Sequence, residues 1–487
     1  MLYLGVDLGT SSLKILLADA SGTIIDTESR EYPLYFPAAN CAEQDPDDWF
    51  NAFVETLRAL GQRRDLSEID GVSFSGQMHG LVMLDGQDRV IRPAILWNDN
   101  RTTRECEYLN QDIGKDKLIE WTGNIAFTGF TAPKVLWVRA NEPDNFSRIA
   151  KIMLPKDYLI YKMSGVFASD VSDNSGTLYF DVEHGHWSQP MLDILGITAR
   201  QLPAVCQSYD VVGHVSAEFA RATGMSEQTH VIAGGGDQAV GAVGTGTVGN
   251  GRLSISLGTS GVVFASNADY CRVESGAMHS FRHADGRFHM MGVMLSAAGS
   301  NDWWVKNILR DSNYKEVDQG AAAAKAEGLY FLPYLTGERS PINDPAARGA
   351  FFGLTAAHTR DDMSRAVLEG ISFGLLDCYR SMTEAGASAS FARVIGGGAK
   401  SPPWLQMLSD VLGLELRTIN TAEGGGLGAV ILAMTGCGQF KSVEEGCSAL
   451  IRDVKIYSPN PDETARYADK FVKFKEMYER VKGAFTM

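Results

Sequence analysis

Two short turns rich in glycine, threonine and serine are the first places where this sequence could do chemistry. Residues 7–11 (DLGTS) lie between two apolar runs, and residues 256–260 (SLGTS) lie between two more, about half a chain later. Such turns expose backbone N–H groups and hydroxyls with little side-chain bulk, which is a geometry that wraps phosphate oxygens. For either copy alone an ordinary β-hairpin turn is the better interpretation, but the pair together favours phosphate binding.

Two charged side chains flank the first of these turns. Asp7 precedes it and could hold Mg²⁺ directly or through water, because Mg²⁺ prefers carboxylate and water oxygens. Lys14 lies on the returning apolar run and could meet a phosphate as a point charge. The first turn is therefore predicted to bind phosphate, with a magnesium site at Asp7.

A third carboxylate follows a run of three glycines. Residues 234–238 read Gly-Gly-Gly-Asp-Gln and come directly after the apolar segment 231–233. Glycines allow the backbone to approach a ligand closely, and Asp237 at the mouth of this turn could accept the proton of a substrate hydroxyl. The alternative is that Asp237 caps the N-terminus of the following helix. Position in the sequence does not decide between base and cap.

Two other segments place polar or small residues after an apolar strand. Residues 77–80 (QMHG) follow the strand expected at 69–75, and polar groups at strand ends in α/β sheets commonly face the ligand crevice. A lone histidine such as His79 is nevertheless more often structural or exposed. Residues 393–404 (RVIGGGAKSPPW) place glycines after a strand, where they could admit a nucleotide base or ribose. The alternative for this segment is a plain strand–helix connection.

Two glycine-rich patterns are excluded as nucleotide motifs. Residues 244–249 match G-x-G-x-x-G, but they do not follow an apolar strand within a βαβ unit. Residues 396–401 resemble the end of a P-loop, but Ala399 separates Gly398 from Lys400. The sequence therefore predicts neither a dinucleotide site nor a P-loop kinase.

Strands and helices that alternate along the chain would position these residues, and this alternation predicts the α/β class. The helix expected at 42–60 follows from the helical spacing of Trp49, Phe53 and Leu57, and the last ~30 residues predict a second amphipathic helix. Strands are expected at 2–6, 13–18, 23–32 and 69–75, and a strand–turn–strand at 253–266.

The chain of 487 residues is too long for one ordinary core. The repeated turn predicts duplicated domains, with a boundary in the glycine-rich stretch 234–251 and hence domains at 1–245 and 246–487.

The composition disfavours several classes of partner. The formal net charge of −15 makes nucleic acid and anionic membrane surfaces poor candidates. Seven cysteines without a C-x-x-C pair predict neither a disulfide framework nor a zinc site, and reduced thiols suit a cytoplasmic protein. We expect no signal peptide, because the N-terminus lacks a basic region, and no membrane span, because no apolar run reaches 18 residues.

Together these segments resemble the FGGY family of carbohydrate kinases, a branch of the actin, hexokinase and Hsp70 superfamily. The resemblance covers nearly the whole chain. It rests on DLGTSSLK (7–14), GFTAPKVLWV (129–138), GGGDQAVGA (234–242), SLGTSG (256–261) and GGGAKSPPW (396–404). It implies an α/β fold of two actin-like, ribonuclease H-like ATPase domains that face each other across a cleft.

The resemblance also implies roles for particular residues, with ATP and Mg²⁺ as cofactors. Asp237 would be the catalytic base, and Asp7 would serve catalysis as the magnesium ligand. The residues implied to contact the phosphates are Thr10, Ser11, Lys14, Gly258 and Thr259, and those implied to contact the adenosine are Gly397 and Gly398.

Within the family, segments such as AEQDP (42–46) and SGQMHG (75–80) are similar to the members that phosphorylate the ketopentose xylulose in pentose catabolism. The product would be D-xylulose 5-phosphate, with the sugar held by Met78, His79, Asp237 and Gln238. Three alternatives stay open: a kinase for another ketose or polyol (ribulose, gluconate or glycerol), an actin- or Hsp70-like ATPase without sugar kinase activity, and a non-catalytic sugar sensor. A homodimer is expected only because dimers are common among such proteins.

Overall fold

The structure is a computed structural model and describes residues 1–485. The chain divides into two compact units, each described by itself below. The first unit comprises Met1–Gly249, Ser280–Phe288 and Glu423–Ile451, and the second comprises Asn250–His279, His289–Ala422 and Arg452–Met487. We predicted one boundary, between residues 245 and 246. The first unit runs to Gly249 and then takes in two later segments, and a division at residue 245 stays a prediction.

A mixed sheet organises the first unit, in the order β13-β14-β5-β1-β2-β3, and β15 also pairs with β5. β1 pairs antiparallel with β2 and parallel with β5, and β5 pairs parallel with β14. The hairpin and the strands predicted near 23–32 and 69–75 are confirmed. The bounds are β1 Leu2–Leu8, β2 Ser12–Asp19, β3 Ile24–Glu31, β5 Ile69–Gly76, β13 Val211–His214, β14 His230–Ile232 and β15 Gly235–Gly236.

Helix α1 (Pro46–Gly61) buries Trp49, Phe53 and Leu57 in the apolar core on one side of this sheet. The predicted helix is thus confirmed, but its expected start at residue 42 is wrong. Asp45 caps the helix and Pro46 occupies its first turn, while Glu43–Gln44 forms the short strand β4. A proline disfavours helical backbone at the preceding residue, so the helix begins there.

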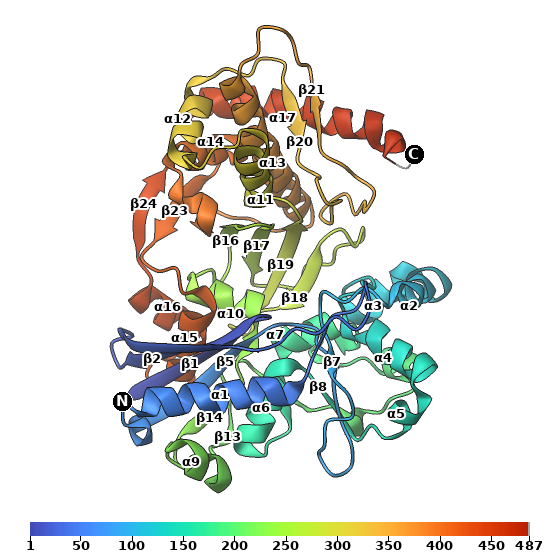
Figure 1. The fold of residues 1–487 in the computed structure, drawn as a ribbon, viewed down its shortest axis with the longest axis vertical. Helices are drawn as coiled ribbons and strands as arrows, with labels where there is room; N and C mark the ends of the chain where they lie inside the picture. The colour runs from blue at the N-terminus through green and yellow to red at the C-terminus, as the bar shows by residue number, and fades with distance from the viewer. Residues whose placement is uncertain (486–487) are drawn as a thin grey trace. The chain divides into compact units, whose positions relative to one another are not determined.

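Two glycine-rich helices pack together on the first unit. In Figure 1 the red-brown α15 (Gly424–Gly436) lies beside the blue strands of the sheet, and it contacts α10 (Asp237–Gly244), β1 and β5. A Cβ placed on Gly428 would lie only 1.9 Å from the carbonyl oxygen of Val240, and one on Gly244 would lie 1.9 Å from that of Gly424. The backbones of the two helices therefore touch, with no room for larger side chains.

The second unit repeats this architecture. β16 pairs antiparallel with β17 and parallel with β22, β22 pairs parallel with β23, and β23 pairs antiparallel with β24. β1 and β5 of the first sheet follow the same pattern, so the predicted duplication and the α/β class are confirmed. The bounds are β16 Arg252–Leu257, β17 Gly261–Asn267, β19 Phe288–Met294, β22 Phe391–Ile395, β23 Glu415–Ile419 and β24 Asp453–Tyr457. The strand β18 (His279–Arg282) falls mostly within the first-unit segment Ser280–Phe288.

The predicted terminal helix is also confirmed as α17 (Pro461–Val481), which buries Tyr467, Phe471, Phe474 and Tyr478. The other helices of the second unit are α11 Ala298–Trp303, α12 Tyr314–Ala323, α13 Arg360–Glu384 and α14 Pro402–Leu412. Those of the first unit are α2 Thr103–Glu107, α3 Lys115–Thr122, α4 Thr131–Asn141, α5 Pro143–Ser147, α6 Pro155–Ser164, α7 Val171–Asn174, α8 Gln189–Leu195, α9 Ala217–Thr223 and α16 Val443–Leu450.

Several two-stranded sheets complete the described fold: β4 with β7 (Ala94–Ile95), β6 (Val82–Leu84) with β8 (Lys151–Met153), β9 (Ala168–Asp170) with β12 (Ala204–Cys206), β10 (Phe180–Asp181) with β11 (His186–Trp187), and β20 (Tyr330–Leu332) with β21 (Ala350–Phe352). Within residues 1–485, no helix combines the length and the apolar character that a membrane span requires. The homodimer and the cytoplasmic location stay predictions.

Candidate active site

The turn between β1 and β2 is held by side chains from elsewhere in the first unit. The N–H of Gly9 donates to the carbonyl of Ser12 at 3.0 Å. The indole N–H of Trp97 donates to the Thr10 hydroxyl at 2.9 Å, and the Gln44 amide donates to the Thr10 carbonyl at 2.7 Å. Ser11 is exposed at the tip of the turn. The turn is thus fixed in place while its outer edge stays open to a ligand.

Gln44 links this turn to α1 and to the end of β5. Its side-chain oxygen accepts from the indole N–H of Trp49 and from the amide of Gln77, both at 3.0 Å. Sequence reasoning used residues 42–46 for the start of the expected helix and for family resemblance, and it missed this role. The available signal was a glutamine next to a helix start, which by itself does not predict burial.

Asp7 lies at the end of β1, opposite Lys14 on β2 and Ser75 on β5. Burial raises the pKa of Asp7, while the nearby Ser75 hydroxyl and the charge of Lys14 lower it. Lys14 also forms an ion pair with Glu423 at 2.5 Å. A Cβ placed on Gly425 would lie 2.7–2.8 Å from the Asp7 carboxylate. The glycine therefore keeps the space beside this carboxylate clear of side chains.

Asp237 is the first residue of α10, and Gly236 is the N-cap of that helix. The structure therefore does not show the capping role weighed for Asp237. β15 pairs in parallel with β5, and Gly235 lies opposite Ser75, which also lies opposite Asp7. Asp237 therefore follows β15 at the same end of the strands as Asp7. Burial raises the pKa of Asp237 to about 7, and the charge of Asp7 adds to this, while hydrogen bonds from Gln238 oppose it. A carboxylate with a pKa near neutrality is suited to accept a proton.

Met78 and His79 both lie against Gly176, and Met78 also lies against Gly236. A Cβ on Gly236 would lie 2.9–3.0 Å from side-chain atoms of the buried Met78. Nδ1 of His79 lies 2.8 Å from the carbonyl oxygen of Gly176, and the imidazole stacks on Phe130 with ring centroids 4.8 Å apart. The half-buried Gln238 follows Asp237 in α10. The predicted sugar-binding residues thus meet in one region of the first unit.

The backbone of His79 is in the left-handed region, with φ of 69°. Such values are uncommon for residues other than glycine and need support from their surroundings. The fully buried ammonium of Lys134 donates to the carbonyls of His79 at 2.8 Å and Gly129 at 2.7 Å, and the Thr131 hydroxyl also donates to His79. Burial lowers the pKa of Lys134 to about 7. The segment 129–138, one of those that resemble the family, therefore holds His79 in position.

A buried ionic cluster lies beneath the glycines that lead to Asp237. The ammonium of Lys156 is 2.6 Å from Asp157, 3.0 Å from Asp170 and 3.8 Å from Asp173, and all four side chains are buried. Burial lowers the pKa of Lys156, but the three carboxylates outweigh this and raise it well above its ordinary value. Sequence reasoning missed the cluster, because its members come from α6, β9 and α7.

Hydrogen bonds connect this cluster to the site. Asp170 accepts from the hydroxyl of Ser172 at 2.5 Å, and the Ser172 hydroxyl in turn accepts the backbone N–H of Gly236 at 3.2 Å. A Cβ on Gly76 would lie 2.7 Å from the Lys156 side chain. The cluster thus supports both β5 and the segment that carries Asp237.

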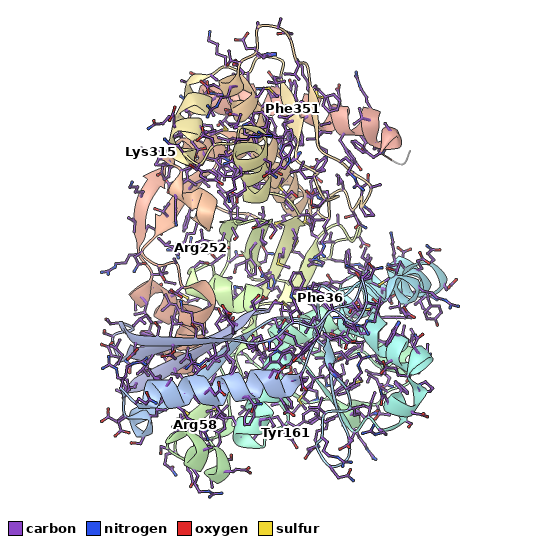
Figure 2. All side chains as sticks on the ribbon, viewed as in Figure 1. Phe36, Arg58, Tyr161, Arg252, Lys315 and Phe351 are labelled. Atoms are coloured by element: carbon purple, nitrogen blue, oxygen red, sulfur yellow. The ribbon has the colours of Figure 1, made fainter. Side chains whose placement is uncertain are left out.

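The second unit has its own candidate site around the turn between β16 and β17. The N–H groups of Ala297 and Gly299 donate to the Thr259 carbonyl, and that of Ala298 donates to the Gly258 carbonyl, at 2.9–3.1 Å. A cavity of about 1050 Å³ opens beside this turn. Lys315, labelled in Figure 2, is one of its lining residues. The cavity wall includes the predicted nucleotide-binding glycines and their neighbours: Leu257, Gly258, Thr259, Gly397, Gly398 and Trp404.

The predicted site residues therefore form two groups, each within its own unit. The first group lies around the ends of β1 and β5 and the start of α10, and contains Asp7, Thr10, Ser11, Lys14, Met78, His79, Asp237 and Gln238. The second group lines one cavity and contains Gly258, Thr259, Gly397 and Gly398.

Comparisons with known proteins extend over nearly the whole chain. Residues 2–244 match the N-terminal domain of the FGGY family of carbohydrate kinases, and residues 253–437 match its C-terminal domain. Xylulose kinase of Escherichia coli (strain K12) is 40% identical over 484 residues, which is 99% of each chain, and that of Bacillus subtilis (strain 168) is 38% identical over 99% of this chain and 98% of its own. The crystal structure of a "xyloylose kinase" from Brucella ovis, 35% identical, superposes with a TM-score of 0.94 and covers 99% of this chain and 100% of that one.

Proposed function

Because the chain belongs to the FGGY family of carbohydrate kinases, in which ATP donates the phosphate, we propose that its sugar substrate is D-xylulose and its product D-xylulose 5-phosphate. The observation that carries the proposal is the grouping of Met78, His79 and Asp237 in a chain related over its full length to xylulose kinases. An ATPase without sugar kinase activity has less support, since the relatives are carbohydrate kinases.

Asp237 is the group that accepts the proton of the reacting hydroxyl, the C5 hydroxyl of xylulose. Its raised pKa lets the carboxylate hold that proton while the hydroxyl oxygen attacks phosphorus. Met78, His79 and Gln238 place the sugar beside it, and Lys134 fixes the backbone of His79. These residues contribute positioning, which together with electrostatic stabilisation accounts for almost all of catalysis in phosphoryl transfer.

The turn between β1 and β2 binds the transferred phosphate. Thr10 and Ser11 offer hydroxyls and backbone N–H groups, and Lys14 exchanges its ion pair with Glu423 for a phosphate oxygen. Asp7, in the side-chain-free space beside Gly425, has the oxygen ligand that Mg²⁺ prefers, so the residues present fit that ion. Bound Mg²⁺ would neutralise part of the phosphate charge.

The cavity of the second unit binds the nucleotide. We assign the adenosine to Gly397 and Gly398 and the phosphates to Gly258 and Thr259. The volume of about 1050 Å³ is ample for a nucleotide, since ligand pockets commonly measure ~300–1,000 Å³. Backbone N–H groups of the glycines can approach the ligand because no side chain covers them.

Replacing Gly398 with leucine is expected to raise the KM for ATP by about tenfold or more, because a tenfold change needs only ~1.4 kcal/mol of lost binding. A Cβ at this position would lie 2.8 Å from both Leu257 and Trp404, so a leucine must displace the cavity wall. Gly483→Leu is the matched control, because Gly483 is exposed, does not line the cavity, and a Cβ there meets nothing within 4 Å. Initial rates at varied ATP would measure the effect, and equal KM values for both variants would contradict the assignment.

The pH profile is a second expected result. A general base works only when ionised, and burial raises the pKa of Asp237 to about 7. We therefore expect kcat/KM for xylulose to fall about tenfold per pH unit below pH ~7 and to level off above it. Initial rates from pH 5.5 to 8.5 would measure this limb. A flat profile down to pH 5.5 would contradict a base with the raised pKa.

A substrate panel tests the sugar itself. The purified chain with Mg-ATP would be assayed for ADP release with xylulose, ribulose, glycerol and gluconate. We expect kcat/KM for xylulose to exceed the others by about tenfold or more, the discrimination that ~1.4 kcal/mol of differential binding supplies. Equal values for several sugars would remove the xylulose assignment and leave the kinase. ADP release without sugar, stimulated by unfolded peptide, would instead favour the chaperone-like alternative.

A further inference from the structure

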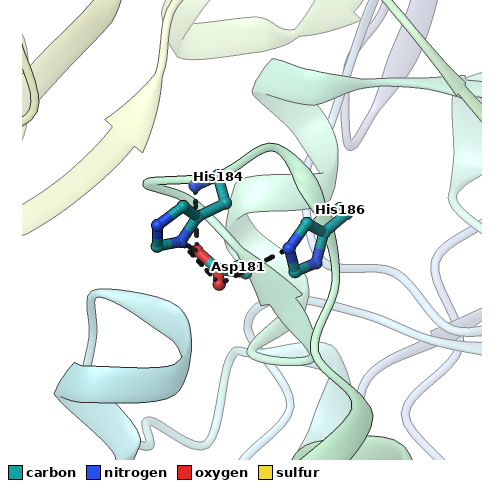
Figure 3. A group of neighbouring side chains, drawn as sticks. All are labelled: Asp181, His184 and His186. Atoms are coloured by element: carbon teal, nitrogen blue, oxygen red, sulfur yellow. Dashed lines mark hydrogen bonds and ion pairs between the residues drawn. The ribbon is translucent and has the colours of Figure 1, made fainter.

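A short β-hairpin of the first unit brings two histidines and an aspartate together (Figure 3). β10 and β11 pair antiparallel with Asp181 directly opposite His186, so their side chains share one face of the hairpin. His184 lies in the connecting turn. One ligand-capable atom from each of the three side chains lies within 4.8 Å of the other two.

The hydrogen bonds of the hairpin orient these atoms. Nδ1 of His184 lies 3.0 Å from Oδ2 of Asp181, and Nε2 of His186 lies 4.0 Å from the same oxygen. Nδ1 of His186 lies 3.1 Å from the carbonyl oxygen of Trp187. A carbonyl can only accept, so Nδ1 of His186 carries a ring proton and Nε2, which faces Asp181, is the nitrogen of that ring left for an ion. The Asp181 carboxylate likewise accepts from Nδ1 of His184, and an ion would take the place of that proton. Metal-binding histidines are commonly fixed in this way by a bond from the other ring nitrogen.

The turn that carries His184 is fixed independently of these three side chains. Arg282 donates to the carbonyls of Val182 and Glu183 at 2.6 and 2.5 Å. Gly185, with φ of 75°, donates to the carbonyl of Asp181 at 2.8 Å. The backbone is therefore held in place before any ligand binds, which lowers the entropic cost of binding.

We propose that Asp181, His184 and His186 bind a divalent transition-metal ion of the Zn²⁺ class. Two imidazole nitrogens and a carboxylate suit Zn²⁺, Ni²⁺ or Cu²⁺ better than Mg²⁺, which prefers oxygen ligands. Ligands of Zn²⁺ stand ~2.0–2.2 Å from the ion and hence about 3.4 Å from one another. The rings of His184 and His186 are 64% and 65% exposed, so little packing opposes the shift that closes the remaining distance once an ion replaces the hydrogen bond between His184 and Asp181. Water completes the coordination, and the site shares no residue with those assigned to phosphoryl transfer.

The test is calorimetric titration of the full-length chain, free of any affinity tag, with Zn²⁺ in the presence of excess Mg²⁺. We expect one saturable Zn²⁺ site per chain and, with Co²⁺, visible absorption bands typical of nitrogen ligation. His186→Gln and Asp181→Asn each remove a ligand. Each should weaken binding at least as much as the loss of a second-shell partner does, about 10–100-fold.

Glu183→Gln is the matched control. Glu183 lies in the same turn, and this change alters the net charge by as much as Asp181→Asn does, but its exposed side chain is not part of the cluster. It should bind Zn²⁺ as the wild type does, and Zn²⁺ should raise the Tm of both but not that of His186→Gln. The absence of saturable binding to the wild type, or equal binding to His186→Gln, would overturn the proposal. Xylulose kinase activity of the ligand variants should equal that of the wild type, so failure here leaves the proposed function untouched.

Discussion

Replacing Asp237 with alanine is expected to slow turnover by about 10²–10⁴-fold, the usual loss when a general base is removed. Asp237 is the first residue of α10 and lies near the ends of β1 and β5. Its pKa of about 7 suits proton transfer at neutral pH. Asp237→Asn should lose as much, because the amide keeps the shape of the side chain but cannot accept the proton.

The measurement is kcat with saturating xylulose and ATP, together with ATP binding by calorimetry. ATP binding should be retained, because the nucleotide cavity belongs to the second unit. Gly241→Ala serves as the control on the same helix, where a Cβ meets nothing within 4 Å. Near-normal turnover of Asp237→Ala would remove the proton-accepting role from this residue.

Lys156→Met is expected to destabilise the protein by about 3–5 kcal/mol, the usual cost of removing one partner from a buried ion pair. Methionine matches the length of the lysine stem but leaves Asp157, Asp170 and Asp173 without their counter-charge. Burial raises the pKa of Asp173 well above its ordinary value, and neither of its carboxylate oxygens has a hydrogen-bond partner among the described residues. Asp157 and Asp170 still accept hydrogen bonds from their neighbours, but no ammonium then lies beside them.

Urea unfolding followed by fluorescence would measure this loss. Lys162→Met on the same helix is the matched control, because Lys162 is exposed and its loss should change stability by no more than about 0.5 kcal/mol. Adding Asp170→Asn to Lys156→Met should recover part of the stability, since it removes one of the buried charges. If Lys156→Met were as stable as the control, the ion pairs of Lys156 would not stabilise the folded protein, and the expectation would be wrong.

The sequence predicted the elements that local patterns determine. Apolar runs around Gly-Thr-Ser turns predicted both hairpins, and helical spacing of Trp49, Phe53 and Leu57 predicted α1, although only the proline and its cap set where α1 begins. The contacts around the site depend instead on residues distant in sequence. Ser172 meets Gly236 across 64 positions, and no pattern near either residue predicts that bond.

The candidate site divides in the same way. Asp7, Asp237 and the glycines could be predicted because a carboxylate next to glycines can be recognised within a segment of about five residues. The buried supports, Gln44 and Lys156, were not found because a polar residue predicts exposure unless its partners are known. Family resemblance supplied His79, and the structure adds the reason for its unusual backbone, since Lys134 and Thr131 hold its carbonyl.

The position of α15 in the sequence has a consequence for biosynthesis. α15 covers β1 and β5, yet it lies at residues 424–436, whereas the strands that it covers are complete by residue 76. During translation the apolar surface under α15, which includes Tyr3, Leu16 and Ile232, therefore stays uncovered while the 164 second-unit residues of Asn250–His279 and His289–Ala422 are made, an interval of about 8–33 s at ~5–20 residues per second. The unit that begins first is completed late, and the nascent chain depends during this interval on protection from aggregation.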